Sequence, residues 1–142
     1  MKMTREGVNP PIRKTKGSCG YDISCPEDVD IYNDTWVNLD LGILMEKGDI
    51  PDGYCALIVP RSSMGVKIKL RVANTVGVID SDYTMDTIKA MVTVDVSDQG
   101  KKGVSLRRND RILQMVLVPF GVIATERPPT KERVGGYGST GV

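Results

Sequence analysis

The sequence predicts an all-β protein, an antiparallel jelly roll or distorted β-barrel. Short apolar or alternating segments recur along the chain, and Gly, Pro, Asp or Asn separates them roughly every ten residues. Val, Ile, Leu and Met must supply most of the core, because aromatic residues make up only 5% of the chain. A chain of 142 residues is long enough to form one domain with a substantial core.

We expect the alternating segments to form strands, with turn residues between several of them. The strands are expected at Tyr21–Ser24, Asp28–Tyr32, Thr35–Leu44, Tyr54–Pro60, Leu70–Ala73, Gly77–Asp80, Ile88–Val94, Gly103–Arg107 and Arg111–Ala124. Turns are expected at Asn33-Asp34, Pro51-Asp52-Gly53, Ser81-Asp82 and Asp98-Gln99-Gly100. Ser62–Lys69 is the one segment that favours a short helix. This order favours an antiparallel sandwich over alternating strands and helices.

The two ends of the chain differ from its middle, and we expect residues 1–124 to form the β domain. Residues 1–16 are polar and basic and should form an extended N-terminal arm. Residues 125–142 should form a flexible linker followed by a flap, because Thr125–Lys131 is charged and rich in proline. Arg133–Gly141 is too rich in glycine to fold alone, yet its arginine, aromatic ring and hydroxyls can order over a bound ligand. The alternative is a frayed terminus.

Charge and composition argue against several functional classes. The 19 basic residues balance the 18 acidic ones, so nucleic-acid binding is not expected. The longest apolar stretches are too short to span a membrane, and the N-terminus lacks the apolar core of a secretory signal. The three cysteines form no CxxC pair and the chain has no histidine, so a zinc site is not expected. An odd number of thiols favours the reducing cytoplasm.

The stretch Asn74–Tyr83 carries the strongest chemical signal. It places Asp80 at the end of an apolar strand, just before a turn, and Tyr83 three residues later. A strand holds its last side chain rigidly, which suits a general base that must be aimed at a water. Because the chain has no histidine, such a base must be a carboxylate, a lysine or a thiolate. The alternative is an ordinary hairpin turn.

Three further segments favour ligand binding, although each has a structural alternative. Pro60–Gly65 follows an apolar strand and presents hydroxyls and N–H groups to an anion, whereas serine pairs at helix starts are more often N-caps. Asp22 follows a glycine at the start of the first strand, as a turn acid also would. Gln114 lies inside an apolar strand, where a buried amide needs partners from the protein or from a ligand.

Taken together, these segments resemble the five motifs of the homotrimeric dUTPase family, the deoxyuridine triphosphate nucleotidohydrolases. The motifs occur in order and span nearly the whole chain: Gly20–Ile23, Pro60–Ser63, Asn74–Tyr83, Arg111–Gln114 and Arg133–Gly141. The resemblance implies a jelly-roll subunit of a threefold trimer whose active sites each draw on three subunits. It also implies hydrolysis of dUTP to dUMP and pyrophosphate by in-line attack of water on the α-phosphorus. That reaction keeps uracil out of DNA and supplies dUMP for thymidylate synthesis.

The resemblance implies a role for each matched residue. Asp80 would activate the attacking water, and Asp22 would hold waters of a Mg²⁺ ion bound to the triphosphate. Tyr83 would pack under the sugar and leave no room for a 2′-hydroxyl. The other matched residues would bind the substrate. Ser62, Ser63 and Gln114 would contact the phosphates, with Arg61 supporting their loop, and Asn74 and Gly77 would lie on the nucleoside side. From the C-terminal tail, Arg133, Ser139 and Thr140 would bind the outer phosphates, and Tyr137 would stack on the uracil.

Three positions depart from the usual family pattern. Met85 stands where the hairpin turn usually has a glycine, so the hairpin here must bend differently. Arg133 lies one residue closer to Tyr137 than the tail arginine does in many relatives. Lys69–Arg71 occupies a stretch where relatives often have a glycine, so that loop should differ too.

Two alternative functions fit the same fold. A dCTP deaminase needs a glutamate further along the hairpin, and no glutamate lies between Tyr83 and Val104. A binding protein of this fold, such as one with a regulatory protein partner in a phage or virus, would act through protein contacts. The presence of both Asp80 and Asp22 argues for catalysis.

Overall fold

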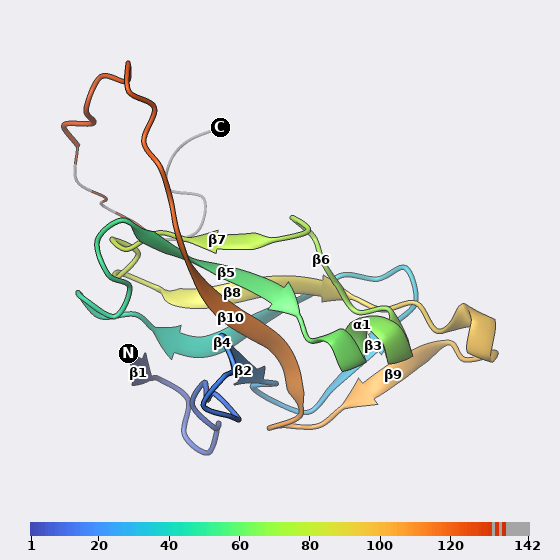
Figure 1. The fold of residues 1–142 in the computed structure, drawn as a ribbon. Helices are drawn as coiled ribbons and strands as arrows, with labels where there is room; N and C mark the ends of the chain where they lie inside the picture. The colour runs from blue at the N-terminus through green and yellow to red at the C-terminus, as the bar shows by residue number, and fades with distance from the viewer. Residues whose placement is uncertain (132, 134, 136–142) are drawn as a thin grey trace.

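The computed structural model describes residues 1–131, 133 and 135, and within them it confirms the predicted all-β fold. Two four-stranded antiparallel sheets and a two-stranded sheet form the described part of the chain (Figure 1). The first sheet runs β1 (Lys2–Met3), β4 (Val37–Leu44), β8 (Thr87–Thr93), β6 (Arg71–Val72). The second runs β2 (Gly20–Ser24), β10 (Arg111–Pro119), β5 (Tyr54–Pro60), β7 (Gly77–Ile79). The third pairs β3 (Val29–Tyr32) with β9 (Gly103–Leu106).

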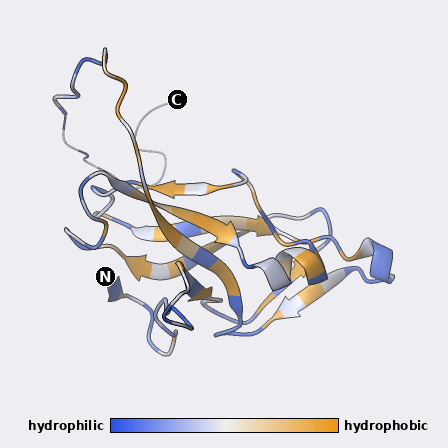
Figure 2. Ribbon diagram, in the orientation of Figure 1, coloured by the Kyte–Doolittle hydropathy of each residue, from blue (hydrophilic) through white to orange (hydrophobic). Residues whose placement is uncertain are grey.

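The core lies between the two larger sheets, where strand alternation points apolar side chains inward. In the described residues, the largest fully buried apolar side chains are Ile23, Ile31, Leu39, Leu41, Ile43, Ile88, Val92, Val94, Val96, Ile112 and Leu113. Figure 2 shows hydrophobic segments along the strands and hydrophilic ones in the loops and in the 3-10 helix η1 (Ser97–Gln99). Burial of these aliphatic side chains supplies the main driving force for folding.

Strand β10 places two of the motif residues side by side. It pairs with β2 on one edge and with β5 on the other. In this register Gln114 lies opposite Asp22 on β2 and opposite Val59 on β5. The two segments that carry Asp22 and Gln114 are therefore neighbours, although they are far apart in the sequence.

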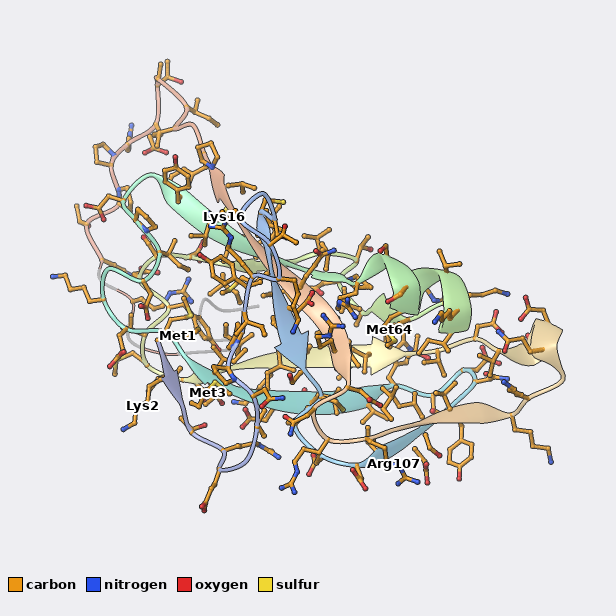
Figure 3. All side chains as sticks on the ribbon, turned by 60° about the horizontal axis from the view of Figure 1, so that its bottom comes forward. Met1, Lys2, Met3, Lys16, Met64 and Arg107 are labelled. Carbon is orange, nitrogen blue, oxygen red and sulfur yellow. The ribbon has the colours of Figure 1, made fainter. Side chains whose placement is uncertain are left out.

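The predicted helix is present as α1 (Ser62–Ile68), and Met64 of this helix packs against the core (Figure 3). The helix ends at Lys69, whose φ of 49° and ψ of 40° lie in the left-handed region. A glycine would adopt that conformation without strain. Among the described residues, no helix is long and apolar enough to cross a membrane.

The predicted strand Arg111–Ala124 is too long, because β10 ends at Pro119. Proline has no N–H to continue a ladder, and the last bond on this edge runs from Phe120 N to Gly53 O at 3.0 Å. Beyond it, Val122 and Ile123 are 61% and 75% exposed. Figure 1 shows the chain after β10 leaving the sheets and returning toward β7.

The N-terminal arm contains short pairings that the sequence does not predict. Strand β1 pairs antiparallel with β4, and Ile12 forms an isolated bridge with Asp22. The side chain of Val8 is buried within the arm. The remaining predicted strands are present, with ends that differ by one or two residues.

Candidate active site

The segment from β6 to β8 lines a cavity of about 260 Å³ that brings together five of the predicted site residues. It is not an ordinary hairpin of paired strands, because β7 pairs with β5 while β8 pairs with β4 and β6. Its lining includes Asn74, Gly77, Asp80, Tyr83 and Arg133. Asn74 lies in the turn between β6 and β7, and Asp80 directly follows β7. We call this space the hairpin cavity.

Two local features shape the side of the hairpin cavity that is formed by the β6–β7 turn and by β7. Thr75 has a positive φ of 63°, and its N–H donates to the carbonyl of Val72 at 3.0 Å, which makes the turn into β7 tight. Gly77 pairs with Ile58 on β5, and a Cβ at Gly77 would lie only 3.1 Å from the Cβ of Ile58. Glycine at this position therefore lets β7 approach β5 closely.

Tyr83 forms a fixed side of the cavity. Its side chain is 7% exposed, its N–H donates to the carbonyl of Asp80 at 3.1 Å, and its hydroxyl donates to the carbonyl of Thr87 at 3.2 Å. Because Tyr83 is held by hydrogen bonds at its backbone N–H and at its hydroxyl, its buried ring presents a fixed face to the cavity.

The hairpin bends without the turn glycine of the family pattern. Met85 is 67% exposed and is not among the residues with positive φ, so no left-handed conformation is needed there. Asp86 closes the turn instead, because its carboxylate accepts from Thr87 N at 2.8 Å and pairs with Lys89 Nζ at 2.6 Å. The Lys89 ammonium lowers the pKa of Asp86, and the Asp86 carboxylate raises the pKa of Lys89.

Arg133 reaches the hairpin cavity from the C-terminal segment. Its guanidinium forms ion pairs with Asp80 and, from Nε, with Asp82 at 2.9 Å. The guanidinium carbon lies 5.5 Å from the centroid of the Tyr83 ring, within range of a cation–π contact. In this structure Arg133 therefore contacts the predicted base and the aromatic wall of the same chain.

A second cavity, of about 470 Å³, collects residues predicted to lie on the phosphate side. Asp22, Arg61 and Gln114 line it, together with Lys14 and Arg111 from outside the predicted set. Three cations and one carboxylate give this lining a net positive charge, which favours an anion. We call it the basic cavity.

Asp22 is held between two arginines in the basic cavity. Its side chain is 12% exposed; Oδ1 accepts from Arg61 Nε and Oδ2 from Arg111 Nη1, each at 2.8 Å. Arg61 also donates to the carbonyl of Arg111 at 3.1 Å. Charge-assisted bonds on both oxygens fix the carboxylate and keep both arginines directed toward the cavity.

Gln114 owes its position to a glycine on the neighbouring strand. A Cβ at Gly20 would lie 2.5 Å from Gln114 Oε1, so only glycine leaves room for the amide. The amide Nε2 donates weakly to the carbonyl of Pro60 at 3.4 Å. Ser62 and Ser63 begin α1 beside that carbonyl, and in the described part of the chain neither hydroxyl caps the helix.

Among the described residues the two cavities share no lining residue, so this part of the subunit does not bring Asp22, Arg61 and Gln114 to Asp80 and Tyr83. The predicted residues Tyr137, Ser139 and Thr140 lie outside the described residues. The charged residues at the cavities that the prediction missed include Lys14, Asp82 and Arg111. Asp82 and Arg111 stand inside quoted motifs, whereas nothing in the sequence around Lys14 marks it.

The described residues contain no group of three or more His, Cys, Asp or Glu side chains that could hold a metal ion. Asp22 can still fit Mg²⁺ through water, because a carboxylate oxygen that accepts one guanidinium bond keeps a further lone pair. Mg²⁺ commonly keeps several waters and binds through one carboxylate and substrate phosphates. The Asp22 carboxylate therefore fits a Mg²⁺ ion that arrives bound to a polyphosphate.

A profile of the dUTPase family matches residues 7–141. The chain belongs to the dUTPase family. The deoxyuridine 5′-triphosphate nucleotidohydrolase of Hydrogenobaculum sp. is 37% identical over 147 aligned positions, covering 100% of this chain and 96% of that one.

Two solved dUTPase structures resemble this fold. The dUTPase of Streptococcus mutans has a TM-score of 0.63 and 30% identity, covering 80% of this chain and 87% of that one. A mutant dUTPase from phage phi11 of S. aureus, described for the coordination of a structural Mg(II) ion, has a TM-score of 0.71. It is 20% identical, covers 89% of this chain and 94% of that one, and shows likeness of fold alone.

Proposed function

We propose that this dUTPase-family protein hydrolyses dUTP to dUMP and pyrophosphate by in-line attack of an Asp80-activated water on the α-phosphorus. The hairpin cavity is the observation that carries the proposal. Its buried aromatic wall, close-packed glycine and strand-end carboxylate belong to one short segment, residues 74–83. A nucleoside can be positioned there, with the base aimed at the adjacent phosphorus.

Asp80 suits the role of base by position and by elimination. It directly follows β7, its side chain is 54% exposed at the cavity mouth, and the chain has no histidine to take its place. Hydrolysis needs one proton removed from the attacking water as the bond to phosphorus forms. Asp80 would accept that proton, and pyrophosphate would leave from the opposite side.

Tyr83 would select the sugar. Its ring is buried and its hydroxyl donates to the carbonyl of Thr87, while its backbone N–H donates to the carbonyl of Asp80, so the ring cannot easily move aside for an added hydroxyl. A deoxyribose packed on this face would leave no space for a 2′-hydroxyl. Asn74 and the backbone near Gly77 would read the uracil, because a mismatched base leaves buried polar groups unpaired at a cost of about 1–3 kcal/mol.

The basic cavity would take the triphosphate. Gln114 and the serines of α1 are proposed to contact phosphate oxygens with Arg61 supporting their loop, and Asp22 to hold waters of a Mg²⁺ ion. When bound, Mg²⁺ would neutralise part of the phosphate charge. The two arginines on Asp22 keep that carboxylate fixed, so the cavity needs little reorganisation when substrate binds.

A homotrimer would join the two cavities into one site. In the single subunit they are separate, and exposed apolar side chains lie near the hairpin and after β10, namely Val78, Met91, Phe120, Val122 and Ile123. We propose that residues 1–124 form the trimeric β domain and that 125–142 close over a site, with Tyr137 on the uracil and Arg133, Ser139 and Thr140 on the phosphates. Light scattering tests the assembly: a stable monomer at micromolar concentration would contradict it.

The reaction would take place in the cytoplasm, where it would keep uracil out of DNA and supply dUMP for thymidylate synthesis. Pyrophosphate release from dUTP, with and without EDTA, tests the activity most simply. We expect release that EDTA suppresses, and none from dCTP. Ammonia from dCTP would instead favour the deaminase, whose glutamate is missing between Tyr83 and Val104. Nucleotide binding without turnover would favour a binding protein.

A further inference from the structure

The side chain of Arg133 is far more buried than the segment that precedes it in the sequence. Residues 121–131 are all exposed, yet the side chain of Arg133 is only 16% exposed. It donates to Asp80 and to Asp82, and its guanidinium faces the Tyr83 ring at 5.5 Å. Two carboxylates and a ring face therefore surround one planar cation.

This arrangement matches what a guanidinium binds best. Its N–H groups point in fixed directions within one plane, so two carboxylates on one turn can each accept a bond while the flat face covers an aromatic ring. Asp80 and Asp82 stand two residues apart, at the start of the Ser81-Asp82 turn. Without a cation between them, the two negative charges would repel each other.

We propose that Asp82 is a positioning residue that, together with Asp80 and Tyr83, holds Arg133 in the empty hairpin cavity. The arginine then competes with the incoming nucleoside for the face of Tyr83 and covers the carboxylate of Asp80. Binding of substrate displaces the guanidinium and frees it for the phosphates. The inference rests on the proposed function, because it takes the hairpin cavity as the nucleoside site.

Asp82 can be changed without breaking the turn. Its backbone carbonyl accepts from Thr84 N at 2.9 Å, while its carboxylate bonds to Arg133. Asp82→Asn keeps the backbone and the turn preference but removes the charge. Asp98→Asn is the matched control. Asp98 lies on η1, outside the hairpin cavity, is exposed to a similar degree as Asp82, and pairs with Lys69.

The first measurement needs no nucleotide. In the full-length protein without ligand, the Nε–H of Arg133 should give a distinct NMR signal whose exchange with water is slowed. Asp82→Asn should speed that exchange severalfold, and Asp98→Asn should leave it unchanged. An Arg133 signal that exchanges like that of a free arginine in the unsubstituted protein would overturn the proposal, whatever the activity of the protein.

The second measurement is a double-mutant cycle with 2′-deoxyuridine as the probe. This nucleoside is uncharged, so removing a carboxylate has no direct charge–charge effect on its binding, and the cycle isolates the part of the effect that passes through Arg133. Asp82→Asn should tighten binding about two- to fivefold, as expected for an exposed ion pair. Arg133→Ala should tighten it further, and adding Asp82→Asn to Arg133→Ala should change nothing more. An equal effect of Asp82→Asn in both backgrounds would overturn the proposal.

Salt provides an independent check on the same probe. Ion pairs at the cavity mouth weaken as ionic strength rises, so deoxyuridine should bind the unsubstituted protein more tightly at 0.5 M than at 0.05 M salt. Arg133→Ala should lose most of that dependence.

If the slowed Nε–H exchange is present but no variant binds deoxyuridine, the proposed function and the competition fail together. If all variants bind equally, only the competition fails.

Discussion

A Cβ on Gly20 would lie 2.5 Å from Oε1 of Gln114, so the glycine of the first motif makes room for the glutamine of the fourth. We therefore expect Gly20→Ala to displace the amide. The KM for dUTP should rise about 5- to 100-fold, the cost of one lost buried hydrogen bond. Gly121→Ala is the control, since a Cβ there meets nothing within 4 Å and Gly121 does not line the basic cavity. Equal KM values for the two variants would show that the Gln114 amide does not contact substrate.

Replacing Asp80 tests the proposed base. Asp80→Asn keeps the backbone carbonyl that accepts from Tyr83 N, so the hairpin should remain folded. We expect kcat to fall about 10²–10⁴-fold, while a non-hydrolysable dUTP analogue still binds in calorimetry. Asp52→Asn, in the turn before β5, removes the same charge elsewhere. Turnover of Asp80→Asn close to that of Asp52→Asn would remove Asp80 from the role.

The left-handed conformation of Lys69 predicts a stabilising substitution. Lys69→Gly should relieve the strain at φ 49° and raise the melting temperature by roughly 2–4 °C. The ion pairs of Lys69 with Asp98 at 3.1 Å and Asp95 at 3.7 Å are exposed, so their loss should matter little. Lys69→Ala loses the same ion pairs but keeps the strain. A lower melting temperature for the glycine variant than for the alanine variant would contradict this explanation.

The buried thiol of Cys25 predicts a loss of stability in alkaline solution. Burial raises its pKa from an ordinary 9.0 to about 11, because the thiolate would lose its hydration. Between these values the unfolded chain releases a proton that the folded chain keeps, so the free energy of unfolding falls as pH rises. The thiol contributes fully below about pH 9, and on the order of 2 to 3 kcal/mol is lost as the pH rises through 11.

Urea denaturation at pH 8, 9, 10 and 11 measures this loss. Lysines also titrate in this range, so the comparison with Cys25→Ala isolates the thiol. The variant should be less stable at pH 8, because it loses packing in the core, but its stability should fall less steeply with pH. Parallel curves for the two proteins would show that the Cys25 thiol does not contribute.

The sequence predicts the strands well where alternation and turn residues agree. It fails after Pro119, because apolar residues such as Val122 and Ile123 continue the strand pattern, yet no strand among the described residues pairs with them. Periodicity reports which residues are apolar and not what covers them. It also misses β1, which is too short to show a period.

Four of the predicted residues of the hairpin cavity follow from the sequence, because Asn74, Gly77, Asp80 and Tyr83 lie within one short stretch whose strand and turns set how they face each other. The basic cavity depends on the register of β10 with β2, which sets Gln114 opposite Asp22 and cannot be read from local patterns. The contact between Arg133 and Asp82 joins residues 51 positions apart. Charge alone gave no reason to choose that pair among 18 acids and 19 bases.

Hydrolysis of dUTP in water enriched in ¹⁸O tests the central claim most directly. Attack of an Asp80-activated water on the α-phosphorus forms the new P–O bond in the nucleotide product. We therefore predict that mass spectrometry will find one ¹⁸O atom in dUMP and none in pyrophosphate after a single turnover. Label in pyrophosphate would place the attack on the β-phosphorus, and no hydrolysis of dUTP by the assembled protein would contradict the proposed function itself.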